Sequence, residues 1–365
     1  MTSDNNNALA VGSPGQISRR NLLKTGGASA VALTTGMALT HTKAKAQDMT
    51  KGADNFYKSD AVTLQKVTFQ NQYKQTVAAN LIRPKDANPE GPAPAIIVGH
   101  PMGAVKEQAA TLYATKMAEY GYVTLALDLP YWGESEGEPR NLVAPDAYAE
   151  AFSAAADYLS SLDFVDPERI GAIGVCASGG FAIAAAKIDP RIKAIATASM
   201  IDMGGATRMM VQDPEQWLAM TRASVEQRMI EFAGGQTDYT GGTVLEVTEE
   251  TPQFQRDFYE FYRTSRGKVV PKGATDVTIT RPTLSSNNRF LNFYPLNDIE
   301  KISPRPILFL AGENAISLEL IKAAHALAAE PKELLVVAEA NHVDLYDRTD
   351  LIPFDKLNAF FESNL

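Results

Sequence analysis

The chain has a single cysteine, Cys176, and it stands where an expected strand turns directly into an expected helix. The strand, residues 169–175, is apolar, and small residues follow it. A nucleophile at such a turn has a strained backbone, so the positions two before and two after must be small, as Gly174 and Ser178 are. The following helix points amide groups at the sulfur, which favours a thiolate. The spacing predicts a nucleophilic thiol at Cys176.

Ser178 is the alternative nucleophile, because the residues two positions away from it, Cys176 and Gly180, are also small. The strand register favours Cys176, since the apex of such a turn comes directly after the last strand residue, Val175. A lone cysteine can also be an inert buried side chain. As the only cysteine in the chain, it cannot form an internal disulfide.

The elements that must position this turn alternate along the chain. Strands are expected over residues 62–69, 76–82, 95–99, 122–127, 169–175, 192–198, 307–310 and 333–337. Helices are expected over residues 107–120, 144–161, 179–187, 318–329 and 353–361. Strands separated by helices indicate crossovers in a mostly parallel, doubly wound α/β sheet, and the first two strands fit an antiparallel edge.

Residues 201–300 interrupt this alternation. They include an amphipathic stretch at 217–232, a glycine-rich segment and an aromatic, helix-like run at 254–262. An insertion between two strands of such a sheet is most simply a cap over the carboxyl ends of the strands, where ligands bind. We therefore expect a core over residues 47–200 and 301–365, with a cap over 201–300.

The run Gly174-Val175-Cys176-Ala177-Ser178-Gly179-Gly180 resembles the Gly-x-Cys-x-Gly-Gly turn of the dienelactone hydrolase family, a cysteine branch of the α/β-hydrolases. Ser178 replaces the first glycine of the pair. The resemblance covers residues 60–200 and 300–365, and it implies the α/β-hydrolase fold.

The segment Gly99-His100-Pro101-Met102-Gly103 is similar to the loop that supplies an oxyanion-hole amide in these folds. The likeness implies that the N–H groups of Met102 and Ala177 hold the oxyanion. Pro101 stands where a glycine is usual and has no N–H to donate. The likeness also implies a structural role for His100.

The base is sought among four histidines. His41 lies in the N-terminal leader, His100 belongs to the oxyanion loop, and His325 lies within an expected helix. His342 follows the last expected strand, where the resemblance implies the catalytic histidine. We therefore expect His342 to be the general base.

Two residues are candidates for the acid that orients the base. The resemblance implies an aspartate in a Gly-x-x-Asp loop, but the sequence reads Gly312-Glu313-Asn314-Ala315. Glu313, in the same loop, is favoured, and Asp202, after the preceding strand, is the alternative. A cysteine needs this acid less than a serine does, because thiols ionise more readily.

The first 46 residues read as an export signal. Arg19-Arg20 begins a basic region, a weakly apolar stretch rich in Ala, Gly and Thr follows, and Ala44-Lys45-Ala46 offers a cleavage site. The paired arginines resemble the twin-arginine signal, which implies the twin-arginine export machinery as a partner and a periplasmic or secreted location. The apolar stretch is too short and too rich in glycine for stable membrane insertion.

Charge and motifs exclude several kinds of partner. The chain carries a net charge of −9. Residues 1–46 hold five basic residues and one acidic residue, so their removal leaves 29 basic and 42 acidic residues, a net charge of −13. This argues against nucleic acid as a partner. The sequence lacks Gly-x-Gly-x-x-Gly, P-loop and His-Glu-x-x-His motifs, so we expect no cofactor and no metal.

These features predict a hydrolase that cleaves an ester, lactone or thioester of a small molecule through a Cys176-His342-acid triad and an acyl-enzyme. A first alternative is an acyltransferase of the same fold, in which an alcohol or amine replaces water. A second is a catalytically silent exported binding protein, which the missing loop aspartate favours.

Overall fold

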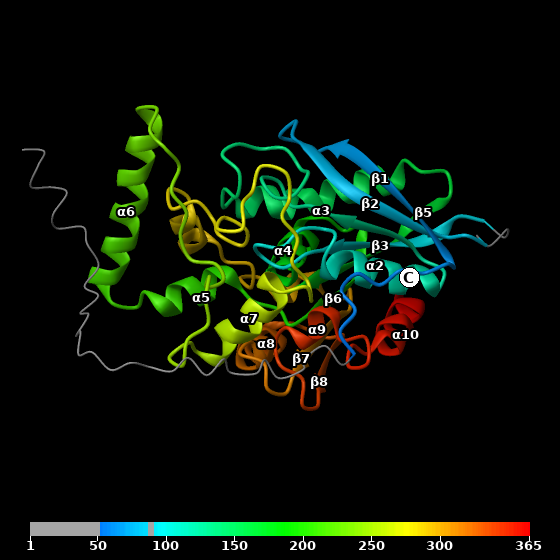
Figure 1. Ribbon diagram of the computed structural model, residues 1–365. Helices are drawn as coiled ribbons and strands as arrows, with labels where there is room; N and C mark the ends of the chain where they lie inside the picture. Colours follow the sequence, from blue (N-terminus) through cyan, green and yellow to red (C-terminus); the bar gives the residue numbers. More distant parts are fainter. Residues whose placement is uncertain (1–51, 87–90) are drawn as a thin grey trace, which may run out of the picture. The chain divides into compact units, whose positions relative to one another are not determined.

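An eight-stranded sheet organises the residues that the computed structural model describes, 52–86 and 91–365 (Figure 1). The strand order is β1-β2-β4-β3-β5-β6-β7-β8. The strands are β1 (Val62–Gln70), β2 (Thr76–Pro84), β3 (Ala93–Gly99), β4 (Val123–Leu127), β5 (Val165–Val175), β6 (Ile192–Ala198), β7 (Ile307–Gly312) and β8 (Lys332–Val337).

The predicted antiparallel edge is confirmed. β1 pairs with β2, and β2 with β4, in antiparallel register, whereas every other neighbouring pair is parallel. Most side chains of β1 are exposed, while all five residues of β4 are buried. The central strands are apolar without alternation because both of their faces are covered.

Helices connect the parallel strands as expected. α2 packs with α10, and α3 with α4. Within the described part of the chain, the α-helices outside residues 201–300 are α2 (Ala109–Glu119), α3 (Pro145–Ser160), α4 (Ala177–Ile188), α8 (Leu318–Leu327), α9 (Asp344–Asp347) and α10 (Phe354–Asn364).

The boundaries differ most from prediction around the turn at Cys176. Helix α4 begins at Ala177, two residues before the predicted start at 179, so strand and helix are separated by Cys176 alone. β5 begins at Val165, four residues before the predicted start at 169. Its first part carries Pro167 and a register shift against β3, irregularities that hide a strand from pattern analysis.

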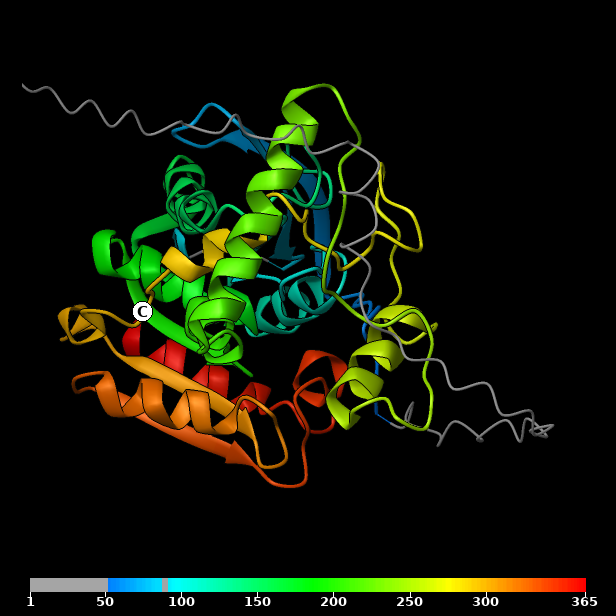
Figure 2. The same ribbon diagram turned by 90° about the vertical axis from the view of Figure 1, so that its left-hand side faces the viewer.

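The segment between β6 and β7 holds three helices and two short 3-10 helices: α5 (Met203–Met210), α6 (Pro214–Phe232), α7 (Gln253–Arg263), η1 (Asn287–Asn292) and η2 (Ile299–Ile302). The predicted helical runs at 217–232 and 254–262 correspond to α6 and α7. Figures 1 and 2 show α5, α6 and α7 gathered beside one end of the strands.

The predicted export signal, residues 1–46, lies outside the described residues. Among the helices that are described, none combines the length and the apolar character that a membrane crossing requires.

Candidate active site

Cys176 occupies the tight turn between β5 and α4. Its φ of 54° and ψ of −120° are a strained combination for a residue with a side chain. Its N–H donates to the carbonyl of Ala198 (2.8 Å), and its carbonyl accepts from the N–H of Ile201 (3.1 Å). A Cβ added to Gly174 would lie 2.3 Å from the carbonyl oxygen of Ser178, so the turn requires glycine there. The local sequence thus builds the predicted turn.

Ser178 lies in the first turn of α4, but its hydroxyl points into the core. The hydroxyl donates to the carbonyl of His100 at 2.5 Å, and the side chain is fully buried. A Cβ on Gly99 would lie 2.7 Å from this hydroxyl, which explains the glycine at the end of β3. Ser178 therefore holds the oxyanion loop, and the structure favours Cys176 over Ser178 as the residue available for attack.

The two predicted oxyanion donors meet at the sulfur of Cys176. The backbone N–H groups of Met102 and Ala177 both hydrogen-bond to the thiol. His100 lies beneath the loop, where its Nε2 accepts from the N–H of Leu129 (3.1 Å) and its Nδ1 lies 2.7 Å from the carbonyl of Pro101. Burial lowers the pKa of His100, so its neutral ring serves both contacts. Both candidate oxyanion donors therefore lie beside the candidate nucleophile, and His100 supports the loop that carries Met102.

An ionic cluster around the buried side chains of Lys106 and Asp128, which sequence reasoning missed, fixes the same loop. Lys106 is fully buried, and its Nζ lies 2.7 Å from Asp128 Oδ2 and 2.6 Å from Glu134 Oε2. The backbone N–H of Lys106 also donates to Asp128 Oδ1 (2.7 Å). No local pattern links Glu134 to Lys106, because the two residues lie 28 positions apart in the sequence. We call Lys106, Asp128 and Glu134 the ionic cluster.

His342 lies between β8 and α9 with its imidazole buried. Its Nδ1 is 2.9 Å from the hydroxyl of Ser317, and its Nε2 is 3.0 Å from the hydroxyl of Tyr346. Burial lowers the pKa of His342 to about 3, because no carboxylate partner offsets the cost of charging the ring. The resting imidazole is therefore neutral.

The structure does not bring Glu313 to His342, which corrects the favoured choice of acid. The Glu313 carboxylate is exposed and accepts from the N–H of Glu339 at 3.0 Å. Asp202 caps the N-terminus of α5 instead, accepting from the N–H of Gly205 at 2.9 Å. The hydroxyl of Ser317 lies beside Nδ1 of His342, in the place where the acid was expected. A hydroxyl can accept the ring N–H without carrying charge, so a spacing search for an acid could not find it.

Tyr346 is the second residue that sequence reasoning missed. It lies four residues after His342 on the short helix α9, and its hydroxyl hydrogen-bonds to the Cys176 thiol and to the hydroxyl of Tyr262. Tyr262 comes from α7, so the insertion contributes to the site. The signal in the sequence is the spacing of His342 and Tyr346, which one helical turn brings together.

A cavity of about 290 Å³ opens on the thiol, and we call it the thiol cavity. Aliphatic, aromatic and uncharged polar side chains line it, and no charged residue is among those described at its wall. Most of the lining comes from the insertion: Ile201, Met203, Thr207, Met210, Gly241, Gly242, Thr243, Gln255, Phe258, Tyr262, Thr280, Pro282, Asn287 and Phe290.

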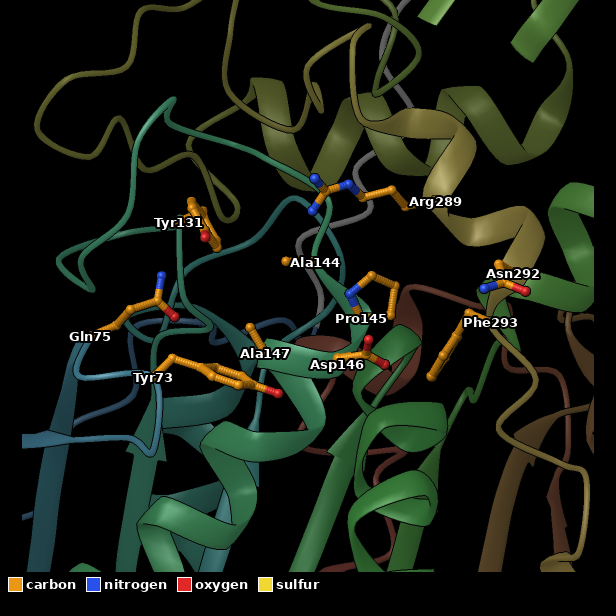
Figure 3. A pocket seen from close by; sticks show the side chains of 10 residues that line it. All are labelled: Tyr73, Gln75, Tyr131, Ala144, Pro145, Asp146, Ala147, Arg289, Asn292 and Phe293. Atoms are coloured by element: carbon orange, nitrogen blue, oxygen red, sulfur yellow. The ribbon is translucent and has the colours of Figure 1, made fainter. Parts of the chain in front are cut away.

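A larger cavity, of about 560 Å³, lies elsewhere and is shown in Figure 3. Its wall carries the aromatic rings of Tyr73, Tyr131 and Phe293, with Asp146 and Arg289 beside them. None of its lining residues is a candidate nucleophile or base, so the chemistry belongs to the smaller thiol cavity. Over residues 52–86 and 91–365, no group of three or more His, Cys, Asp and Glu side chains forms a metal site.

Comparisons with known proteins agree with this architecture. Residues 77–200 match the sequence model of the dienelactone hydrolase family. The uncharacterized protein PA2218 of Pseudomonas aeruginosa PAO1 is 44% identical over 318 residues, which cover 84% of this chain and 82% of that protein. The crystal structure of PA2218 superposes with a TM-score of 0.79 at 43% identity, covering 86% of this chain and 97% of that one.

Two further proteins are more distant. The crystal structure of the α/β-hydrolase GrgF from Penicillium sp. sh18 matches with a TM-score of 0.68 at 21% identity, over 83% of this chain and 99% of that one, which shows a shared fold. The thiohydrolase aneE of Aspergillus aculeatus is 28% identical over 223 residues, which cover 60% of this chain and 69% of that protein.

Proposed function

This chain belongs to the dienelactone hydrolase family of α/β-hydrolases, and on that premise we propose that it cleaves an ester, lactone or thioester of a small molecule through an acyl group on Cys176. The family and fold support a hydrolase or acyl-transfer enzyme. The observation that carries the finer proposal is the thiol itself, which meets the amides of Met102 and Ala177 at the wall of an uncharged cavity.

The proposed reaction has two halves. The sulfur of Cys176 attacks the carbonyl carbon as the thiol proton passes to His342, and the amides of Met102 and Ala177 hold the resulting oxyanion. Collapse expels the alcohol or thiol, which takes the proton back from His342. Water then gives a proton to His342 and attacks the acyl carbon. The C–S bond breaks, the Cys176 sulfur takes the proton back from His342, and the carboxylic acid leaves. Ser317 orients the imidazole throughout.

The wall of the thiol cavity supports an uncharged, largely apolar acyl group as substrate. Met102, Met203 and Phe258 present apolar surface, and no Lys or Arg is among the described wall residues to bind a carboxylate. A charged acyl group would lose its hydration there without gaining a partner. The name of aneE, a thiohydrolase, makes thioesters the first class to test.

The test is the hydrolysis of p-nitrophenyl esters and acyl thioesters by wild-type protein beside Cys176→Ala and Ser178→Ala. We expect Cys176→Ala to lower kcat by more than about 10³-fold, and Ser178→Ala to retain most activity since it only supports the loop. Loss with Ser178→Ala alone would contradict the assignment. No turnover in any form would favour the silent binding protein, and transfer products with added alcohols would favour the acyltransferase.

Chain length of the substrate provides a sharper test of specificity. We expect kcat/KM to rise from acetyl to butyryl esters, by up to roughly tenfold per methylene, until the cavity is full. An ester of equal length that ends in a carboxylate should be a poor substrate. Equal rates for the neutral and the charged ester would contradict the proposed selectivity.

We also propose that residues 1–46 direct twin-arginine export to the periplasm or the exterior. The pair Arg19-Arg20 and the small residues before Gln47 motivate this. Replacement of both arginines by lysine should leave the protein in the cytoplasm, as cell fractionation would show. Export of the double variant at the normal level would contradict the assignment.

A further inference from the structure

The thiol and the proposed base have a tyrosine hydroxyl between them. The Cys176 thiol hydrogen-bonds to Tyr346, and Tyr346 lies 3.0 Å from Nε2 of His342. Cys176 and Tyr346 line the thiol cavity, but His342 is not among the described residues at its wall. The imidazole therefore lies behind Tyr346 as seen from the substrate.

The orientation of His342 makes Nε2 the proton acceptor. Its Nδ1 faces the Ser317 hydroxyl, which can accept the ring N–H and leave a lone pair on Nε2 toward Tyr346. Burial raises the pKa of Tyr346 well above its usual value, so this hydroxyl keeps its proton near neutral pH and can donate it.

We propose that Tyr346 is a catalytic residue that relays the thiol proton of Cys176 to His342. This rests on the proposed function only in taking Cys176 as the nucleophile. Its main support is that the thiol, the phenol and the imidazole follow one another in a hydrogen-bonded chain.

The relay balances without any further reactant. The S–H bond of Cys176 breaks and its proton joins the oxygen of Tyr346, while the O–H proton that Tyr346 held moves to Nε2 of His342. The products are a thiolate, an unchanged phenol and an imidazolium. The same path in reverse returns a proton to the leaving group, which departs beside Tyr346 in the cavity.

Packing holds Tyr346 in this position. Its ring meets Phe261 edge-on with centroids 5.1 Å apart, and its hydroxyl also bonds to Tyr262. The next residue, Asp347, forms a buried ion pair with Arg266, whose Nη2 lies 2.6 Å from Asp347 Oδ1. These contacts come from the insertion and immobilise α9, so the phenol is preorganised for transfer.

The test measures the rate of Cys176 alkylation by iodoacetamide across pH, which needs no substrate. Tyr346→Phe keeps the ring and removes the hydroxyl, so we expect the rate at neutral pH to fall by roughly 10²-fold and the pH profile to move to higher pH. His342→Gln should give a loss of the same size. The double variant should be no slower than either single variant, because the two residues act in series.

Tyr148→Phe is the matched control. Tyr148 is also fully buried, and its hydroxyl also has two partners, the indole N–H of Trp132 (2.9 Å) and the carbonyl of Leu142 (2.5 Å). Neither partner belongs to the proposed relay. Tyr148→Phe should therefore lower the unfolding temperature without changing the alkylation profile.

An alkylation profile of Tyr346→Phe equal to that of wild type would overturn the relay, as would additive losses in the double variant. Should Tyr346→Phe fail to fold, a ring-fluorinated tyrosine at position 346 preserves packing and acidifies the hydroxyl. The relay predicts that the profile then moves, whereas a packing role predicts that it does not.

The outcomes for the relay and for the proposed function are separable. Alkylation that depends on Tyr346, without turnover of any ester or thioester, would keep the relay and reject the proposed function. Normal turnover by Tyr346→Phe would reject the relay and keep the proposed function.

Discussion

Two polar clusters lie at the proposed oxyanion hole, and they differ in charge. The first is the ionic cluster of Lys106, Asp128 and Glu134. Burial acts to lower the pKa of Lys106, but the charge of Asp128 and hydrogen bonds to Asp128, Glu107 and Glu134 together outweigh it and raise the pKa. The hydrogen bond from Lys106 lowers the pKa of Glu134 to about 2. Both shifts keep Lys106 and Glu134 ionised at neutral pH.

The second cluster, Cys176, Tyr346, His342 and Ser317, is neutral at rest. Burial raises the pKa of Cys176, although its hydrogen bonds with Tyr346 and with the two oxyanion amides oppose that rise. Burial lowers the pKa of His342 to about 3. Both shifts disfavour a resting thiolate–imidazolium pair.

The difference separates two tasks. A permanent ion pair rigidly fixes the loop that carries Met102, because breaking it would strand a charge in the core. The thiol and imidazole start neutral, so charge separates only during the reaction, when the thiol proton moves to His342 and the amides stabilise the oxyanion that forms.

The largest effect is expected from Lys106→Met, which removes the cation and leaves Asp128 buried without it. We expect a loss of about 3–5 kcal/mol in the free energy of unfolding, measured by urea denaturation. Lys66→Met is the matched control, because Lys66 pairs with the same Glu134 at 2.7 Å but its side chain is 62% exposed. It should cost less than about 1 kcal/mol. Equal losses would show that burial of the ion pair is unimportant.

The neutral cluster predicts an acid-sensitive stability. The folded pKa of His342, about 3, is below its unfolded value, so the unfolded state binds more protons and stability falls as pH drops below about 6.5. At pH 5 the loss from this group is about 2 kcal/mol. Burial lowers the pKa of His100 as well. The measurement is therefore the difference in the free energy of unfolding between wild type and His342→Gln, obtained by urea denaturation at each pH. Parallel pH curves for the two proteins would contradict the assignment.

A smaller effect is expected from Ser317→Ala, which removes the Nδ1 partner of His342. Loss of one neutral hydrogen bond of about 1 kcal/mol should lower kcat roughly fivefold and leave KM nearly unchanged. Ser199→Ala is the control, because the Ser199 hydroxyl is equally buried and contacts the carbonyl of His342 (2.8 Å) instead of the ring. A comparable loss of kcat in both variants would indicate that Ser317 only supports the backbone.

Sequence was sufficient for the features that depend on neighbours along the chain. The strained turn at Cys176 needs small residues two positions away, a local steric rule that Gly174 and Ser178 satisfy. The buried parallel strands are continuous apolar runs and could be recognised as strands. Their alternation with helices along the chain then indicated the α/β sheet. The family resemblance placed the candidate base, His342, after the last strand, and in the structure it follows β8.

Only the tertiary structure decided which polar groups meet. Ser317 reaches His342 across 25 residues, Lys106 reaches Glu134 across 28, and Tyr262 of the insertion reaches Tyr346. Such pairs leave no fixed spacing in the sequence, because they form where loops from separate strands converge at the carboxyl edge of the sheet. Glu313 shares a loop with Ser317, yet the path of that loop turns the carboxylate toward Glu339 and the hydroxyl toward the imidazole.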